Sequence, residues 1–471
     1  MFLPDDRGMS GNRAGWPLTL ALCGGSFLVL LDVTVVNVAL PQIGSGMSAG
    51  GSGLPWVVDA YSVPLAALLL ASGAIGDRIG HGPVLRLGLA AFGAASAACA
   101  LAPTIGVLIA ARVVQGIGAA LMLPGTLALL VESTTDEGER NRLVGRWAAI
   151  GGAALPAGPV IGGVLVQAAS WRAVFWLGVP VSALALIPVL RLPRAAANRV
   201  RAGVVDWAGA ALLGTGLACL VTAIVQGRDA PWTAGLLGIA SLGTAAGFVA
   251  VERRATQPLI SIPRAARGAV ATASGVAGLM NLCALGSLFL LTQLFQDVHG
   301  LSPLLAGLAT LPAMLPLPLL GAPAGRLGAR IGVWRTSALG LLVSAAGFAG
   351  IAASITGPDV LFFLLLWGTG LGILTPAIVS AALDAAPDAP GTASGASNTS
   401  RQTGGALGVA VFAVVAGPAY ASGFVPRSTA LFLAGALAFV TAAALCLVVG
   451  QRVGGTARRP AAGTTDAAAG S

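Results

Sequence analysis

The chain has 471 residues, of which 56% are hydrophobic and only 9% are charged, whereas soluble domains carry roughly a quarter of charged residues. Its mean hydropathy of +0.88 is spread over the whole length. These values exclude a soluble globular protein and predict a polytopic membrane protein. All 26 basic residues are arginine, so no lysine is present for a Walker A phosphate loop or a Schiff base. ATP hydrolysis by this chain and lysine-based enzyme chemistry are therefore excluded.

Apolar runs of roughly 20 residues, the length that crosses the hydrocarbon of a bilayer, occur fourteen times between polar or Pro/Gly breaks. Backbone groups must be hydrogen-bonded internally in lipid, so each run is expected to be helical and the fold class all-α. In chain order the predicted spans are 18–41, 55–76, 84–102, 105–131, 143–167, 173–190, 205–226, 233–251, 270–295, 303–324, 335–355, 359–382, 403–419 and 428–450.

The arginines predict the orientation of these spans. If the N-terminus is cytoplasmic, every arginine falls on the cytoplasmic side except Arg172, Arg228 and Arg427, which lie outside, and Arg112, which lies within a span. This asymmetry follows the positive-inside rule. An even number of spans returns the chain to the same side, so both termini are expected in the cytoplasm.

Three groups of residues recur at a nearly constant distance along the chain, which predicts an internal repeat. They are Gly73, Arg78 and Gly80 with Gly321, Arg326 and Gly328; Gly116, Gly118 and Pro124 with Gly368, Gly370 and Pro376; and Gly151-Gly152 with Gly404-Gly405. The predicted organisation is a six-helix bundle over 1–194, two linker helices over 195–260, a second six-helix bundle over 261–452 and a disordered cytoplasmic tail over 453–471.

Six short motifs stand out along the chain: LDVTVVNVALP from Leu31, GAIGDRIG from Gly73, RVVQGIG from Arg112, GPVIGG from Gly158, Ser170-Trp171-Arg172 with Phe175, and the run from Gly395 to Gly405. Together they resemble the fourteen-span drug/proton antiporter family of the major facilitator superfamily, in its multidrug or antibiotic exporter branch. The resemblance implies the major facilitator fold and secondary transport across the cell membrane rather than an enzyme. One departure is that His81 and Gly82 stand where the family has two basic residues, so Arg86 is a candidate to replace them.

Ionisable side chains inside a bilayer are costly and are therefore candidates for function. Asp32, Asp59 and Arg112 all fall in the outer half of their spans. The resemblance implies that Asp32 couples proton and drug and that Arg112 helps it to release the proton. Asp59, Asn37 and Gln115 are the other candidates for the proton-coupling and substrate site. Two alternatives remain open here: a permanent ion pair between Asp32 and Arg112, and an N-capping role for Asp59.

Two further groups have both a functional and a structural interpretation. The resemblance implies that the first group forms a cytoplasmic gate, but these residues could also simply form a turn between two spans. The second group resembles an antiporter motif that occludes the cavity, but its small residues could also serve only helix packing. The gate residues are Gly73, Asp77, Arg78, Gly80 and Arg86, and the antiporter motif is Gly158, Pro159, Gly162 and Gly163.

The predicted function is proton-coupled efflux of an amphipathic, cationic or neutral drug or antibiotic by alternating access. Export of an endogenous metabolite, such as an antibiotic, siderophore or amino acid, by the same mechanism is the alternative. The expected partners are a small-molecule substrate, protons and the lipid bilayer; no nucleic acid is expected, and the protein is expected to be a monomer. Five cysteines without CxxC spacing and two isolated histidines predict no metal site, and no cofactor is expected.

Overall fold

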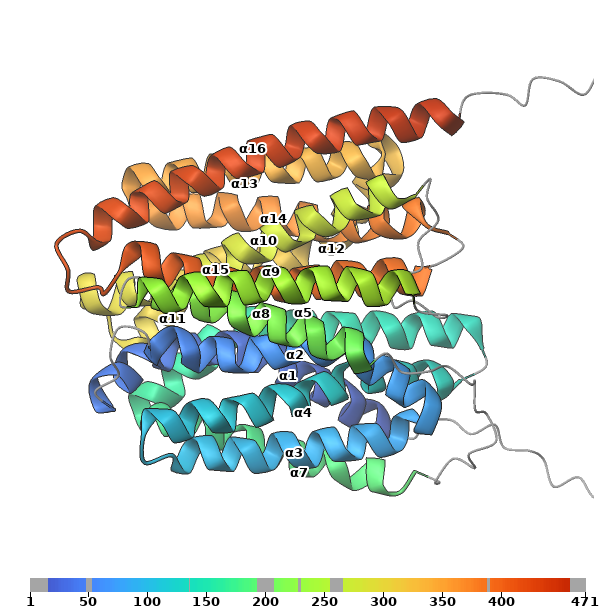
Figure 1. The fold of residues 1–471 in the computed structure, drawn as a ribbon, viewed down its shortest axis with the longest axis horizontal. Coiled ribbons are helices and arrows are strands. Elements are labelled where there is room, and N and C mark those ends of the chain that lie inside the picture. The colour runs from blue at the N-terminus through green and yellow to red at the C-terminus, as the bar shows by residue number, and fades with distance from the viewer. Residues whose placement is uncertain are drawn as a thin grey trace, which may run out of the picture.

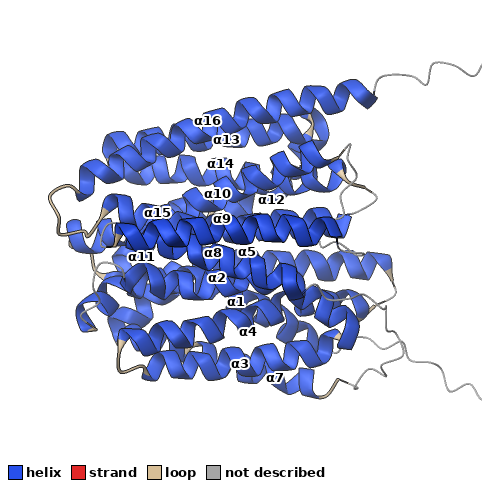
Figure 2. Cartoon of the chain, viewed as in Figure 1, coloured by secondary structure: helices blue, strands red, loops and turns tan. Residues whose placement is uncertain are grey.

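The computed structural model describes residues 16–47, 53–134, 136–192, 207–227, 230–254, 266–387 and 390–457. All regular structure in these ranges is helical, and none of it is strand (Figure 2). The predicted all-α fold class is therefore confirmed. The predicted domain boundaries at 194/195 and 260/261 lie outside the described residues. The predicted disordered tail over 453–471 starts too early, because residues 453–457 continue the helix α16, and the rest of the tail lies outside the described residues.

The helices run side by side across the molecule in roughly one direction (Figure 1). Their bounds are α1 Trp16–Gly46, α2 Gly53–Ile79, α3 His81–Leu101, α4 Ile105–Glu132, α5 Glu137–Ala168, α6 Trp171–Trp176, α7 Gly178–Leu190, α8 Trp207–Gln226, α9 Pro231–Arg254, α10 Arg267–Gln293, the π-helix η1 Leu294–Val298, α11 Pro303–Met314, α12 Pro316–Ile331, α13 Val333–Ser354, α14 Val360–Ala385, α15 Pro390–Ala416 and α16 Phe424–Ala457.

Each predicted span overlaps one helix or two consecutive ones. Three spans are divided, into α6 and α7, α10 and η1, and α11 and α12. The division at Leu315 lies between Pro312 and Pro316, and proline cannot donate the backbone hydrogen bond that continues a helix. A fourth span, α2, bends by 52° between its segments Gly53–Leu69 and Ala71–Ile79.

By length and hydropathy, the described residues contain 11 helices able to cross a membrane, or up to 12 if the bent α2 is one span. The apolar part of α8, Ala211–Gln226, is short. In α15 the predicted start at residue 403 is too late, because the helix begins at Pro390 and its first half carries serine, threonine, asparagine, glutamine and Arg401. Such polar side chains lower the hydropathy without preventing a helix. A count of fourteen spans stays a prediction.

The internal repeat reappears as repeated helix contacts. In α4, a Cβ added to Gly118 would lie 2.8 Å from Phe92 N and 3.0 Å from Gly88 O of α3. In α14, the equivalent Cβ at Gly370 would lie 2.6 Å from Gly340 O of α13. Both helix pairs therefore approach so closely that only glycine fits at the crossing. The two halves of the chain use the same packing device at corresponding positions.

The structure corrects one part of the predicted repeat. Gly80 and Gly332 both precede a helix with a positive φ, at 94° and 91°, a conformation that favours glycine. The loop Gly73–Gly80 therefore corresponds to residues 325–332, and the pairing with Gly321, Arg326 and Gly328 is wrong by four residues. In this register Arg78 matches Arg330, whereas Asp77 matches Ala329. The second half consequently lacks the acidic residue of this loop.

We call the two ends of the molecule the Trp16 end and the Gly46 end, after the first and last residues of α1. Contacts between the two halves are concentrated at the Gly46 end. A Cβ at Gly163 of α5 would lie 2.7 Å from Leu304 Cα of α11. Beside them, Gln296 Nε2 donates a hydrogen bond of 3.0 Å to Val38 O of α1. The halves are closely packed at the Gly46 end.

Toward the Trp16 end, the faces of α5 and α10 that contact the other half at the Gly46 end are exposed. Gly145 lies about five turns before Gly163 on the same face of α5, and it is exposed with no atom near its Cβ position. On α10, Phe289 packs in a core cluster with α1, whereas Gly275, about four turns earlier, is exposed and faces open space. The halves are therefore apart at the Trp16 end.

The two helices between the halves have different environments. Leu217, Val221 and Val225 of α8 form a cluster with α2 and α15, so α8 packs on both halves. By contrast, α9 contacts α8 but has no buried residue in its described length. Figure 1 shows α8 and α9 in front of the region where α1–α7 and α10–α16 meet. An apolar helix that is half-buried on one side and exposed on the rest fits a position that faces lipid.

We expect Gly118→Ala to lower the melting temperature of the purified protein, because α3 and α4 must move apart to admit the methyl group. Overpacking of this kind costs about 1–3 kcal/mol. Gly106→Ala is the matched control, since Gly106 lies in the same helix with no atom within 4 Å of its Cβ position. It should be neutral or slightly stabilising. Equal melting temperatures for the two variants would contradict the close α3–α4 contact.

Candidate functional site

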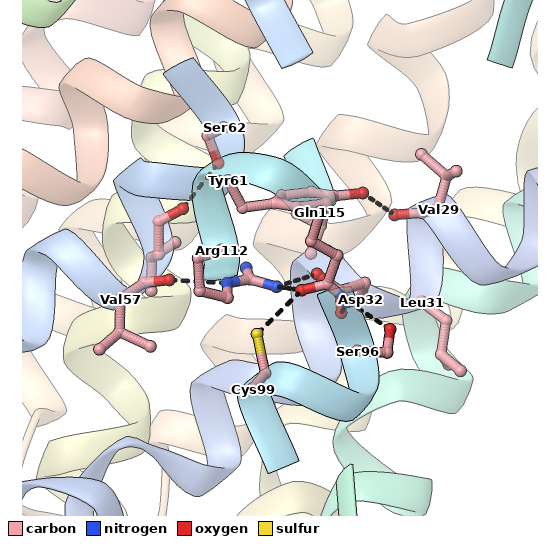
Figure 3. A network of polar contacts seen from close by, with 12 residues as sticks. Val29, Leu31, Asp32, Val57, Tyr61, Ser62, Ser96, Cys99, Arg112 and Gln115 are labelled. Carbon is pink, nitrogen blue, oxygen red and sulfur yellow. Dashed lines mark hydrogen bonds and ion pairs between the residues drawn. The ribbon is translucent and has the colours of Figure 1, made fainter. Parts of the chain in front are cut away.

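A buried polar network joins α1, α2, α3 and α4 in the first half of the chain (Figure 3). Arg112 of α4 is 1% exposed and pairs through Nη1 with Asp32 Oδ2 of α1. Its Nε donates a hydrogen bond of 2.8 Å to Val57 O of α2. The guanidinium therefore ties three helices together around one buried ion pair.

Gln115, one turn after Arg112 on α4, completes the network. Its Nε2 donates hydrogen bonds of 3.0 Å to Asp32 Oδ1 and to Ser96 Oγ of α3. Its Oε1 accepts from Arg112 Nη1 at 2.8 Å. Both oxygens of Asp32 are thus engaged by donors from α4. The carboxylate is held in place, since it is buried and its charge is neutralised by Arg112 in this conformation.

An aromatic ring covers this ion pair. The guanidinium carbon of Arg112 lies 4.4 Å from the centroid of the Tyr61 ring, a distance at which a cation–π attraction operates. Tyr61 is itself anchored by a hydrogen bond of 3.0 Å from its hydroxyl to Val29 O. The sequence analysis did not single out Tyr61 or Ser96. Their polar side chains within apolar spans could have marked them as candidates.

Glycine allows α2 and α4 to bring these groups together. A Cβ at Gly116 would collide with the backbone carbonyl of Tyr61, so a larger residue would separate the helices that hold Arg112 and Val57. At its start, α4 is capped by Thr104, whose hydroxyl accepts a hydrogen bond of 3.4 Å from Val107 N. The motif Arg112-Val113-Val114-Gln115-Gly116 therefore supplies both the polar groups and the close approach.

Asp59 lies near this network but outside it. Its side chain is completely buried, and neither carboxyl oxygen has a hydrogen-bond partner among the described residues. The proposed N-capping role is wrong, because α2 already begins at Gly53 and Asp59 is in the helix interior. An ionised carboxylate without donors is very costly in such surroundings.

Asn37 is not brought into the network either. Its Nδ2 donates a hydrogen bond of 2.8 Å to Val33 O of its own helix, and its buried Oδ1 is unpaired in the described part of the structure.

In the predicted gate loop, the acidic residue Asp77 lies beside a histidine. The Asp77 side chain is 71% exposed, and its Oδ1 lies 3.2 Å from His81 Nε2. His81 also lies 3.9 Å from Glu132 Oε1 at the end of α4. No described arginine at the start of α5 pairs with Asp77. His81, which stands where a basic residue was expected, is therefore the partner of the acid in this conformation.

The other gate residues have local roles. Arg86 donates hydrogen bonds to Val189 O and Leu192 O at 3.1 and 2.7 Å, so it binds the carbonyl end of α7. Arg78 is exposed, and Gly80 supplies the positive φ before α3. At Gly73 no atom lies near the Cβ position. Arg86 is thus used within the first half rather than in a contact with the second.

The GPVIGG motif contacts two different helices. Gly158 and Gly162 lie against α1, where a Cβ at Gly162 would be 2.8 Å from Val35 O. Gly163 lies against α11, and Gly307 of α11 lies in turn against the backbone carbonyl of Pro159. The motif therefore produces both the packing within the first half and the close contact between the halves at the Gly46 end.

A multi-pass helical membrane protein with two similar halves and a buried charge network in one of them has the construction of a secondary transporter. The Major Facilitator Superfamily model matches residues 22–409. The chain belongs to this family, and it is a multi-pass cell-membrane transporter.

Named relatives support the same conclusion. The methylenomycin A resistance protein of Streptomyces coelicolor is 36% identical over 84% of this chain and 84% of its own length. The tetracenomycin C resistance and export protein of Streptomyces glaucescens is 35% identical over 85% of this chain and 76% of its own length. A crystal structure of a peptide transporter, POT, shares the fold with a TM-score of 0.70 at 16% identity, over 95% of this chain and 96% of that one.

We expect Arg112→Ala to destabilise the protein strongly, since it leaves Asp32 buried without its cation, a loss of about 3–5 kcal/mol for a broken buried pair. Arg112→Lys should be less damaging, because lysine keeps the charge but loses the planar fork that reaches Val57 and Asp32 together. Melting temperatures in detergent measure the difference, with the exposed Arg78→Ala as control. A melting temperature of Arg112→Ala equal to that of the control would disprove the structural role of the pair.

Proposed function

We propose that this transporter is a proton-coupled efflux antiporter that exports amphipathic drugs or antibiotics by alternating access. The observation that carries the proposal is the buried Asp32–Arg112–Gln115 network, because a single deep acid held by a guanidinium and an amide can exchange a proton for a rearrangement of helices. The printed functions of the relatives, resistance to methylenomycin A and export of tetracenomycin C, support drug export as its purpose. The fourteen spans and cytoplasmic termini belong to the same proposal.

In this orientation the Trp16 end faces the cytoplasm. The packing of Gly163 on Leu304 then closes the outer side, while exposed Gly145 and Gly275 border an opening toward the cytoplasm. The conformation corresponds to the stage at which a substrate enters from the cell interior. Export would follow when the halves separate at the Gly46 end and meet at the Trp16 end.

Protonation of Asp32 would change the network directly. Neutral Asp32 loses its ionic attraction for Arg112, while the guanidinium keeps its hydrogen bonds to Val57 O and Gln115 Oε1. The links from α1 to α4 would weaken, while those from α4 to α2 would persist. Each proton that enters down a 100 mV potential releases about 2.3 kcal/mol, enough to bias such a rearrangement.

Asp59 is the second candidate proton carrier. It has no cation or hydrogen-bond donor in the described structure, so it meets the requirement for a carboxyl that is neutral in this conformation. Asp32 is paired and Asp59 is not, so the two acids would be occupied by protons at different stages of the cycle.

Asp32→Asn should abolish proton release when substrate binds to the purified protein, because asparagine has no proton to exchange. Tetracenomycin C and methylenomycin A serve as probes, and the signal is the change of a pH-sensitive dye in weakly buffered detergent solution. Asp359→Asn, in a loop away from the network, is the control and should behave as wild type. Wild-type proton release by Asp32→Asn, together with its loss in Asp59→Asn, would transfer the coupling role to Asp59.

Asp77→Asn should slow substrate efflux several-fold while leaving expression and membrane insertion unchanged. The variant removes the carboxylate at the end of α2 that His81 contacts. In the proposed cycle, this carboxylate helps to hold the cytoplasmic side closed. Uptake of the same probes into energised everted vesicles, with and without a protonophore, measures the rate. Efflux at the wild-type rate would rule out a gating role for Asp77.

A further inference from the structure

Arg401 is a deep cation whose surroundings differ from those of Arg112. It lies about three turns into α15, roughly 16 Å from the start of the helix at Pro390. Its Nε is buried without a hydrogen-bond partner, and no carboxylate in the described part of the chain pairs with it. Arg112, in contrast, has Asp32, Gln115 and Val57 around it. A lone guanidinium at this depth is costly unless a counter-charge reaches it.

Two hydroxyl groups with unused hydrogen-bonding capacity accompany this cation at the crossing of α10 and α15. Ser400 Oγ donates a hydrogen bond of 2.7 Å to Ser274 O, so Ser274 of α10 lies beside the turn that carries Arg401. Ser397 lies one turn before Arg401 on the same face of α15. The Oγ atoms of both Ser274 and Ser397 are buried without partners. We call Arg401, Ser397 and Ser274 the Arg401 cluster.

The cluster borders the opening between the two halves. The close crossing of α10 and α15 continues at Gly404, which lies against the backbone of Gly278. Next to this crossing, Gly275 and Ala271 of α10 are exposed, and Gly275 faces open space. Arg401 itself is only partly buried. A ligand that enters between the halves from the Trp16 end can therefore approach the guanidinium.

The charges available to a ligand are unequal in the two halves. In the first half, both Asp32 oxygens are already bound by Arg112 and Gln115, so Asp32 is not free to attract a cationic substrate in this conformation. In the second half, Arg401 presents a positive charge that no carboxylate of the described segments pairs with. The entry conformation therefore favours an anionic group over a cationic one.

We propose that the Arg401 cluster binds the carboxylate of an amphipathic organic acid, which makes such acids the preferred substrate class of the transporter. The proposal rests on the proposed export function. A guanidinium forms two parallel hydrogen bonds with a carboxylate, and charge-assisted bonds of this kind are about twice as strong as neutral ones. The hydroxyls of Ser397 and Ser274 provide further donors. The carboxylate supplies the counter-charge that no described residue of the chain provides to Arg401.

The test is equilibrium binding to the purified full-length protein in nanodiscs, measured by isothermal titration calorimetry. The probes are three matched pairs, benzoate with benzamide, 2-naphthoate with 2-naphthamide, and anthracene-2-carboxylate with its amide, so that only the charged group differs within a pair. Tetraphenylphosphonium is the amphipathic cation for comparison. At least one acid should bind about tenfold more tightly than its amide and more tightly than the cation.

Arg401→Gln should remove the preference for the acid, and Arg401→Lys should retain part of it because the charge remains without the fork. Ser397→Ala should weaken acid binding by a smaller factor and leave amide binding unchanged. Arg427→Gln, at an exposed arginine near the start of α16, is the matched control and should keep the wild-type preference.

The proposal is overturned if no acid binds the wild type more tightly than its amide, or if folded Arg401→Gln keeps the preference. The wild-type comparison and Ser397→Ala decide the question even if Arg401→Gln fails to fold. Acid binding without proton release would disprove the proposed antiport but not the anion site. Proton-coupled efflux of the probes without any preference for acids would disprove the anion site but not the proposed antiport.

Discussion

The arrangement of the first half depends on the ion pair between Asp32 and Arg112. Two charges inside a membrane protein are tolerated only when they neutralise each other and when their remaining donors and acceptors are occupied. Gln115, Ser96 and the carbonyl of Val57 meet this second condition. Because the partners come from α1, α2, α3 and α4, any change in the charge of Asp32 acts on four helices at once. The proposed proton coupling uses this arrangement, in which protonation of one carboxylate would move several helices.

Such a network needs helices that approach closely, and glycine provides the approach. At Gly116 and Gly118 the backbone of α4 lies directly against α2 and α3, and the second half repeats these contacts at Gly368 and Gly370. Between the halves, Gly163 and Gly307 do the same for α5 and α11. Lipid offers no hydrophobic drive for helices to associate, so close backbone packing by small residues supplies much of the attraction.

The two halves share a backbone plan but differ in their charges. Within the described ranges, the first half holds a balanced pair and the acid Asp59, which has no hydrogen-bond partner, whereas the second holds the cation Arg401, which has no paired carboxylate. Asp77 of the first gate loop has the neutral Ala329 as its counterpart. The repeat supplies the two similar halves that the proposed alternating access requires. In the two proposals above, the unequal charges assign proton handling to one half and recognition of an anion to the other.

The sequence by itself determined the all-helical membrane fold, the existence of a repeat and the candidate status of Asp32, Asp59 and Arg112. These follow from hydropathy, glycine spacing and the cost of charge in lipid, which depend on residue type and local order. Only the tertiary structure decided the four-residue correction of the repeat, the interior position of Asp59, the pairing of Asp77 with His81, and the inclusion of Arg401 within α15. Each of these depends on which helix lies beside which side chain. Whether a polar group finds a hydrogen-bond partner depends on residues that are distant in sequence but close in space. Hydropathy along the chain does not predict these contacts.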